Sequence, residues 1–506
     1  MKITDFLDNG EQRQVLIIQY LMTEFGGIKI TELASRLGSN RNTTKEDLDK
    51  LTNNLIALNN PIELIIDGNV VNLIVHERIS FTKIVYFFLK DSLKYKLLLH
   101  MLTSKQVGYQ TLAEMLNISL STLTRKIRDL NQTLDKYHLK IHKGRIIGPE
   151  IAIRYFYFQL FWFGNPYQVN MEKFLNPSVM DLLTFLEKNL DYPFTAEGRV
   201  KLCIWLYITK CRFRNTKVNH ELPLSEALHL AFNQSAFVGL QEVFIRFFSR
   251  YAFQWNQSES QYLYLFMIAN YTLEIENEHV QMLSEIAQNN QTIASVNETF
   301  FSELYRHFSP ELLTEKVKKI MTFSVLQIHY KILYFPSFFS IWGNINRQSQ
   351  LISRPNPELN RLAEQLMQIT FKHVRLEINR EKTYNEESVK KEIFNRYLVI
   401  LYIIYRQLDI HLNVGCDFPF EDSMNALLIE EIEDQINPKI KARFTEFNKQ
   451  NSYDVVITYK DENPELPNST PVYTLLSIEH NIDFPVLEEF LDKYYQNKIH
   501  SKVNLL

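Results

Sequence analysis

The sequence predicts a mainly α-helical, multidomain protein that ends in a small α/β domain. Three observations support this fold class. Glycine accounts for only 13 of the 506 residues, below the usual share of about 7%, and long helical patterns fill the middle of the chain. Near the N-terminus, two pairs of short helices are each followed by a hairpin pattern. After residue 410, short strands alternate with helices, which indicates a largely parallel sheet.

Residues 11–75 predict a winged helix-turn-helix module. An amphipathic helix, Gln12–Glu24, precedes a short positioning helix, Thr31–Leu37, and a second helix, Asn40–Leu55. The inward positions of this second helix are Leu48, Leu51 and Leu55. Its outward residues suited to DNA contact are Arg41, Asn42 and Lys45. A hairpin is expected next, because two apolar runs straddle Asp67-Gly68-Asn69, a sequence that favours a tight turn.

Residues 92–150 predict a second module of the same design. Thr111–Leu116 forms the short helix, and Ser121–Leu134 follows after a turn. The apolar residues of the second helix recur at helical spacing and predict one buried face: Leu123, Ile127, Leu130 and Leu134. The other face carries residue types that reach phosphates and base edges from a major groove: Ser121, Thr122, Arg125, Lys126 and Arg128. Leu139–Ile141 and Arg145–Ile147 are expected to pair as a wing, with Lys143 and Arg145 clamping phosphate.

The distribution of charge distinguishes the two modules. Residues 92–150 contain 10 Lys and Arg against 4 Asp and Glu, whereas residues 1–91 contain 10 against 12. In the first module, Asp47 and Asp49 are expected to dilute the positive face of the second helix. A basic module in a chain of net charge −3 is typical of a DNA-contacting domain. We therefore expect the second module to supply most of the affinity.

Two groups of long helices are expected between residues 161 and 400. The first group is predicted at Met180–Leu190, Ala196–Arg214, Leu224–Asn233, Val243–Phe253 and Ser258–Ile275. The second group is predicted at Asn297–Phe308, Thr314–Tyr334, Asn356–Leu376 and Glu386–Arg406. The aromatic runs Tyr155–Phe163 and Phe335–Phe339 are expected to pack in cores or between domains. The two groups are interpreted as two helical bundles of one kind.

The C-terminal region predicts a small α/β domain. Its strands are expected at Ile410–Val414, Ala442–Phe447, Asp454–Tyr459 and Val472–Ser477, and its helices at Ser423–Ile436 and Pro485–Tyr495. The expected domains are therefore 1–78 for the first winged module, 79–160 for the second module and its connector, 161–285 and 286–400 for the bundles, and 401–506 for the α/β domain.

Several classes of protein are disfavoured. No nucleotide-binding, zinc-protease or serine-hydrolase motif occurs, so we expect no enzyme, no cofactor and no metal site. Three widely spaced cysteines argue for a reducing compartment. The longest apolar runs are shorter than the roughly 18 residues that a membrane span needs. We therefore expect a soluble, cytoplasmic protein without a membrane partner.

The order of these domains resembles that of the Mga/AtxA family of Gram-positive virulence transcriptional regulators. The segment GRIIGPEIAIRYF, Gly144–Phe156, is similar to a pattern that these regulators share with sugar-system activators. The matching residues are Gly144, Ile147, Gly148, Glu150, Ile153, Arg154 and Phe156. The resemblance is strongest over Thr111–Phe156 and covers the remaining chain in architecture.

This resemblance implies a DNA-binding transcriptional regulator, an activator, whose bundles are phosphotransferase-system regulation domains. The implied partners are double-stranded promoter DNA, a second copy of the chain in a homodimer or higher homo-oligomer, and the histidine-containing phosphocarrier or other phosphotransferase proteins. Phosphorylation of bundle histidines would tune activity by adding negative charge. The candidates, in order, are His220 and His373, then His329 and His229.

The resemblance also implies a terminal domain similar to sugar-transport enzyme IIB. Several such enzymes carry a phosphoryl group on a cysteine directly after the first strand, and Cys416 is expected there. The acidic loop that follows, DFPFEDS, would repel phosphate, so a structural cysteine in a fold retained for protein contacts is the favoured interpretation. Two alternatives stay open: an RNA-binding antiterminator-like regulator, and a phosphotransferase component that uses Cys416.

Overall fold

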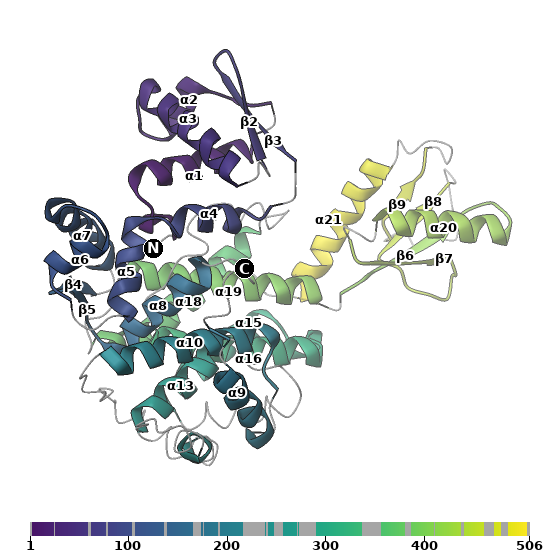
Figure 1. The fold of residues 1–506 in the computed structure, drawn as a ribbon. Helices are drawn as coiled ribbons and strands as arrows, with labels where there is room; N and C mark the ends of the chain where they lie inside the picture. The colour runs from purple at the N-terminus through teal and green to yellow at the C-terminus, as the bar shows by residue number, and fades with distance from the viewer. Residues whose placement is uncertain are drawn as a thin grey trace. The chain divides into compact units, whose positions relative to one another are not determined.

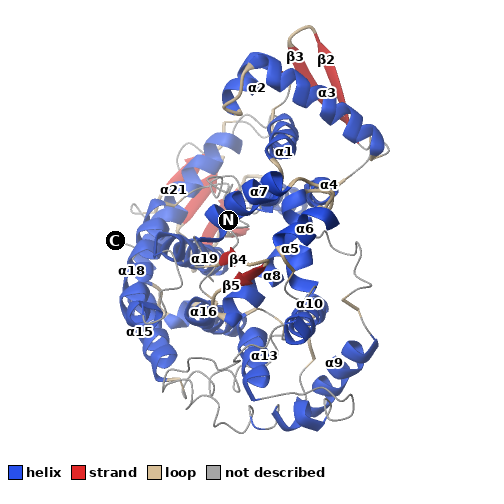
Figure 2. Ribbon diagram, turned by 60° about the vertical axis from the view of Figure 1, so that its left-hand side comes forward, coloured by secondary structure: helices blue, strands red, loops and turns tan. Residues whose placement is uncertain are grey.

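A computed structural model describes the chain in two compact units, and Figure 1 shows their elements in chain order. One unit comprises Met1–Asn297, Phe323–Pro355 and Met367–Arg396, and the other comprises Glu298–Thr322, Asn356–Leu366 and Tyr397–Leu506. The structure describes residues 3–502 except 25, 59–61, 77–78, 104–106, 136–138, 165–173, 176, 191–192, 216–237, 239–240, 247–256, 271, 273–289, 336–355, 380–385, 409, 437–439, 460–469 and 477–483. Among these residues, strands are confined to three small sheets and helices dominate (Figure 2).

The first winged module has the predicted order of elements. A short 3-10 helix, η1 (Ile3–Phe6), leads into it, followed by α1 (Asn9–Leu21), β1 (Ile28–Lys29), α2 (Ile30–Arg36), α3 (Arg41–Ala57), β2 (Ile62–Asp67) and β3 (Val70–Val75). Asn40 caps α3 by accepting a hydrogen bond from the backbone N–H of Thr43 at 2.8 Å. The predicted inward leucines, Leu48, Leu51 and Leu55, are buried. Strand β1, which sequence reasoning missed, pairs antiparallel with β3 and extends the hairpin to three strands.

The second module contains more helices than expected. Its elements are α4 (Phe81–Leu89), α5 (Leu93–Thr103), α6 (Tyr109–Met115), α7 (Leu120–Leu134), β4 (Lys140–His142) and β5 (Arg145–Ile147). The four apolar residues predicted for the inner face of α7 are at most 6% exposed, which confirms the helical spacing. Strands β4 and β5 pair antiparallel, as expected for the wing.

Helix α8 (Glu150–Gly164) connects this module to the helices that follow and is buried on almost every side. Apart from three polar residues, α8 is apolar all round, as a core helix is, and it packs against α10 (Ala196–Asn215). The Phe158 ring meets Phe266 edge to face at 4.7 Å, and Phe266 stacks on Trp205 at 4.3 Å. The aromatic run of α8 is therefore core packing, as predicted.

Long helices follow through residue 407. Besides α10, the described ones are α9 (Pro177–Leu190), α13 (Gln257–Ala269), α15 (Gln291–His307), α16 (Glu315–Tyr334), α18 (Pro357–Asn379) and α19 (Glu386–Gln407), with a 3-10 turn η4 at Pro310–Leu312. The helix predicted at Leu224–Asn233 lies outside the described residues, and the one at Val243–Phe253 is described only through residue 246. No helix among the described residues is long and apolar enough to cross a membrane.

The C-terminal region is a small α/β fold with a parallel sheet, as predicted. Its elements are β6 (Leu412–Asp417), α20 (Asp422–Ile436), β7 (Ala442–Glu446), β8 (Val455–Thr458), β9 (Val472–Thr474) and α21 (Phe484–Lys502). The strand order is β7-β6-β8-β9, and every described pair is parallel. The two inner strands are almost entirely buried, because helices cover parallel sheets on their faces.

Candidate nucleic-acid interface

Helix α7 has the geometry of a recognition helix. The Ser119 hydroxyl caps its N-terminus by accepting a hydrogen bond from the backbone N–H of Thr122 at 3.2 Å. The same hydroxyl lies 2.8 Å from Ser121 Oγ and donates to Thr122 Oγ1 at 3.0 Å. The predicted contact residues Ser121 and Thr122 are therefore ordered at the helix start. Arg125 and Arg128 are exposed on the face opposite the buried leucines, which leaves two guanidinium groups for phosphates or base edges.

Lys126 departs from the predicted set. Its ammonium donates to Asp8 Oδ1 at 2.5 Å, and its side chain is only 14% exposed. Asp8 is the N-cap residue of α1 in the first module. The ion pair thus joins the recognition helix of one module to the first helix of the other. Lys126 lies at the edge of the exposed face, where its long side chain reaches a carboxylate that sequence spacing could not place nearby.

The segment before α1 is held against the second module by further hydrogen bonds. The Lys94 ammonium on α5 donates to the carbonyl oxygens of Asp5 and Leu7, at 3.2 and 3.0 Å. The Ser92 hydroxyl donates to the carbonyl of Phe6 at 2.6 Å. Because these acceptors directly precede Asp8 in the chain, they help to hold its carboxylate in position beside Lys126.

The wing is a tight hairpin whose strand β4 is anchored to α7. Lys143 and Gly144 have φ angles of 48° and 73°, the left-handed pair that a two-residue type I′ turn requires. A Cβ at Gly144 would lie 2.0 Å from the Val107 carbonyl oxygen, so only glycine fits. The side chain of Asn131 on α7 accepts from the Ile141 N–H at 2.6 Å and donates to the Ile141 carbonyl at 3.2 Å. The recognition helix and the wing are thereby fixed to each other.

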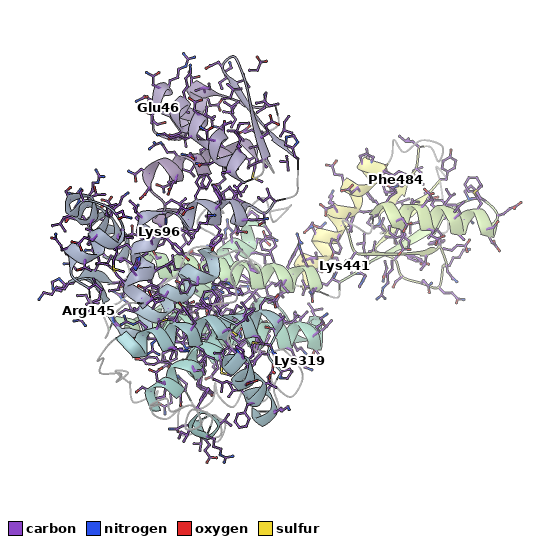
Figure 3. The ribbon with its side chains drawn as sticks, viewed as in Figure 1. Glu46, Lys96, Arg145, Lys319, Lys441 and Phe484 are labelled. Carbon is purple, nitrogen blue, oxygen red and sulfur yellow. The ribbon has the colours of Figure 1, made fainter. Side chains whose placement is uncertain are left out.

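Both cationic wing residues of the prediction are exposed. Lys143 forms part of the turn itself, and Arg145 is the first residue of β5. Figure 3 shows Arg145 at the margin of the second module. The wing therefore presents cationic side chains beside the exposed face of α7.

In the first module, α3 exposes the predicted residues Arg41, Asn42 and Lys45. Arg41 donates to Asn69 Oδ1 at 3.2 Å and so links the helix start to its hairpin turn. The expectation for Asp47 was wrong: its side chain is 2% exposed and accepts from Arg13 Nε of α1 at 2.5 Å. Asp47 therefore stabilises the packing of α1 on α3 and leaves the exposed face. That face still carries Asp49, and it also carries Glu46 (Figure 3).

A chain of four buried charges links α8 to α10 and α13, and sequence reasoning did not predict it. On α8, Arg154 donates to Glu150 Oε1 at 2.9 Å and bonds Glu259 of α13 with both terminal nitrogens, at 2.6 and 2.8 Å. Arg212 of α10 bonds both oxygens of Glu150, at 3.1 and 2.6 Å. All four side chains are at most 5% exposed.

The electrostatics of this ion chain follow from its geometry. Burial alone would raise the pKa of Glu150, but the hydrogen bonds and charges of Arg212 and Arg154 outweigh burial and lower it. A signal in the sequence existed, because Glu150 and Arg154 stand four residues apart in the segment that resembles the Mga/AtxA pattern. Their distant partners Arg212 and Glu259 carry no such signal.

The candidate phosphorylation sites are placed very differently. His373 is exposed on α18, whereas His329 on α16 is 0% exposed and bonds Asn297 Oδ1 through Nδ1 at 2.5 Å. Burial lowers the pKa of His329 to about 3. A phosphocarrier could not reach His329 without local unfolding. His220 and His229 lie outside the described residues.

Cys416 was expected directly after the first strand of the terminal domain. It lies within that strand instead. It is the penultimate residue of β6 and is 1% exposed. Burial, and secondarily the Glu433 carboxylate, raise the pKa of its thiol to about 12. Phosphoryl transfer needs an accessible thiolate, so this placement favours the structural role.

A capped helix with exposed arginines, packed beside a cationic wing, defines the class of winged helix-turn-helix DNA-binding proteins. Residues 77–161 match the family model of the Mga helix-turn-helix domain. This match supports the resemblance to the Mga/AtxA family over one segment, which runs from α4 into α8 and includes Glu150–Arg154. No curated protein matches the chain.

Proposed function

We propose that this protein is a transcription activator of the Mga/AtxA type that binds promoter DNA in the cytoplasm. The observation that supports this proposal most directly is the exposed pair Arg125 and Arg128 on α7, opposite the buried leucine face. These residues lie inside the segment that matches the Mga helix-turn-helix domain. In this proposal, α7 reads bases, the wing residues Lys143 and Arg145 hold phosphate, and α3 of the first module adds weaker contacts.

Binding to duplex DNA over a salt series is the direct test. We expect affinity to fall steeply as salt rises, because each neutralised phosphate releases counterions with a log–log slope of about −0.9. Fluorescence anisotropy with a labelled duplex measures this, and a hairpin RNA of equal charge serves as the competitor. Preference for the RNA would favour the antiterminator alternative, and no binding to either at low salt would contradict the proposal.

We further propose that the bundles respond to phosphotransferase proteins through His373, the exposed candidate among the described residues. Incubation with the phosphorylated histidine-containing phosphocarrier should label His373, and His373→Ala should lose that label while His329→Ala keeps it. Mass spectrometry at neutral to alkaline pH preserves phosphohistidine and maps the site. Labelling of neither residue would contradict regulation through this part of the second bundle.

Self-association is the third part of the proposal. When two DNA-binding chains are held in one oligomer, binding of the first half-site places the second chain at a high effective concentration near the other half-site. A change in dimerisation therefore changes DNA affinity without a new contact between protein and DNA. Analytical ultracentrifugation of the full chain, with and without phosphorylation, measures this coupling. A monomer under both conditions would contradict it.

A further inference from the structure

The four buried charges Arg212, Glu150, Arg154 and Glu259 link α8 to α10 and α13. Buried ion pairs add little net stability, because desolvation offsets their attraction, but in some proteins their geometry selects one arrangement of the groups that carry them. Apolar packing between α8, α10 and α13 already exists, through Phe158, Trp205 and Phe266. The ion chain therefore adds orientation, since two of its links are bidentate guanidinium–carboxylate contacts with fixed direction.

The position of Glu150 determines what is oriented. It is the first residue of α8 and stands three residues after Ile147, the last residue of wing strand β5. Only Gly148 and Pro149 intervene. Arg212 donates hydrogen bonds to both carboxylate oxygens of Glu150. The end of the wing that leads into α8 is therefore fixed to α10 of the first bundle. The wing is fixed at its other side to α7 through Asn131.

We infer that Glu150, Arg154, Arg212 and Glu259 are positioning residues that make the placement of the DNA-binding wing depend on the first helical bundle. This inference rests on the proposed DNA-binding function and names a route by which a bundle could govern it. A shift of the α10 end that carries Arg212 would move or release Glu150, and with it the strand that carries Arg145. The residues act through the wing and do not touch DNA themselves.

Arg212→Met in the full chain is the test, with Arg199→Met as its matched control. Arg199 lies on the same helix, α10, and pairs with Glu187 of α9, so it is not part of the ion chain. We expect Arg212→Met to raise the Kd for duplex DNA about tenfold, in the upper range for mutations that alter coupling between sites. Arg199→Met should stay within twofold of wild type, even where it lowers the unfolding temperature equally.

Hydrogen exchange distinguishes a local change at the wing from a general loss of stability. The wing peptides covering residues 140–147 should exchange faster in Arg212→Met than in Arg199→Met. Arg212→Lys should give an intermediate result, because an ammonium keeps the charge but loses the bidentate contact. If Arg212→Met fails to fold, Arg212→Lys carries the comparison with wild type.

Unchanged Kd and unchanged wing exchange in the Arg212 variants would overturn the inference. Equal effects in Arg199→Met would also overturn it, since they would indicate general destabilisation. If the wild-type chain fails to bind duplex DNA, the proposed function fails, while wing exchange still decides whether Arg212 positions the hairpin. The two failures are therefore distinguishable.

Discussion

Replacing Arg125 and Arg128 together by alanine is expected to weaken duplex-DNA binding about a hundredfold, since each well-placed arginine contributes about 1–3 kcal/mol. Both side chains are exposed on α7, on the face opposite the buried leucines. Loss of two cationic contacts should also flatten the salt dependence by about one unit of slope per phosphate contact removed. Anisotropy titrations at several salt concentrations measure both quantities.

Lys126→Ala provides a control on the same helix. Its ammonium is bound to Asp8, so we expect its removal to change DNA affinity less than threefold, the effect of about 0.6 kcal/mol. Alanine at Arg41 and Lys45 of the first module should weaken binding less than the Arg125/Arg128 change, because Glu46 and Asp49 share that surface. A larger loss from Lys126, or from the first module, would contradict the assignment of α7 as the main reader.

Replacing Arg154 by methionine is expected to lower the free energy of unfolding by about 3–5 kcal/mol, the usual cost of breaking a buried ion pair from one side. The change removes the guanidinium that bonds both oxygens of Glu259 and one oxygen of Glu150. Urea unfolding followed by tryptophan fluorescence reports on this core, because Trp205 stacks in it.

Two further variants show whether the loss arises from the buried charge. Arg154→Met combined with Glu259→Gln should be less destabilised than Arg154→Met alone, since removing both partners leaves less charge unpaired in the core. Arg306→Met removes an exposed guanidinium paired with Glu303 and should change stability by less than about 0.5 kcal/mol. Equal losses of stability in Arg154→Met and Arg306→Met would show that breaking the buried ion chain costs no more than breaking an exposed ion pair.

Acid should weaken the same ion chain. The folded-state pKa of Glu150 lies below its ordinary value of 4.5, so its ionised form is favoured in the folded protein. The stability that it contributes is fully present above pH 4.5 and is lost as the pH falls through the lowered folded-state value.

Local sequence patterns were sufficient for most helices and strands of the two winged modules, although strand β1 and helices α4 and α5 were not predicted. The spacing of Leu123, Ile127, Leu130 and Leu134 fixes which side of α7 is buried, because side chains three and four residues apart share one face. The Asp67-Gly68-Asn69 sequence likewise identifies a hairpin turn, since its residues tolerate the required backbone angles. Alternation of strands and helices after residue 410 identified the parallel sheet.

Partners distant in sequence were not predictable in the same way. Asp47 was expected on the exposed face of α3, and Lys126 on that of α7, because both lie near the boundary of a helical face. Asp47 is buried in an ion pair with Arg13, and Lys126 forms an ion pair with Asp8. Cys416 was expected after a strand, but the sheet extends β6 beyond it and buries the thiol. These differences arise because long-range contacts decide positions that helical or strand periodicity leaves marginal.

The sequence by itself determined the fold class, most elements of the two winged modules and the family resemblance, because periodicity, capping and turn residues act over a few positions. Only the tertiary structure decided which charged residues of α7 stay exposed, that His373 is exposed while His329 is buried, and how Glu150 and Arg154 meet Arg212 and Glu259. The physical reason is that a charge is paired or left to solvent according to neighbours brought close by folding, and those neighbours stand as many as 118 residues away along the chain.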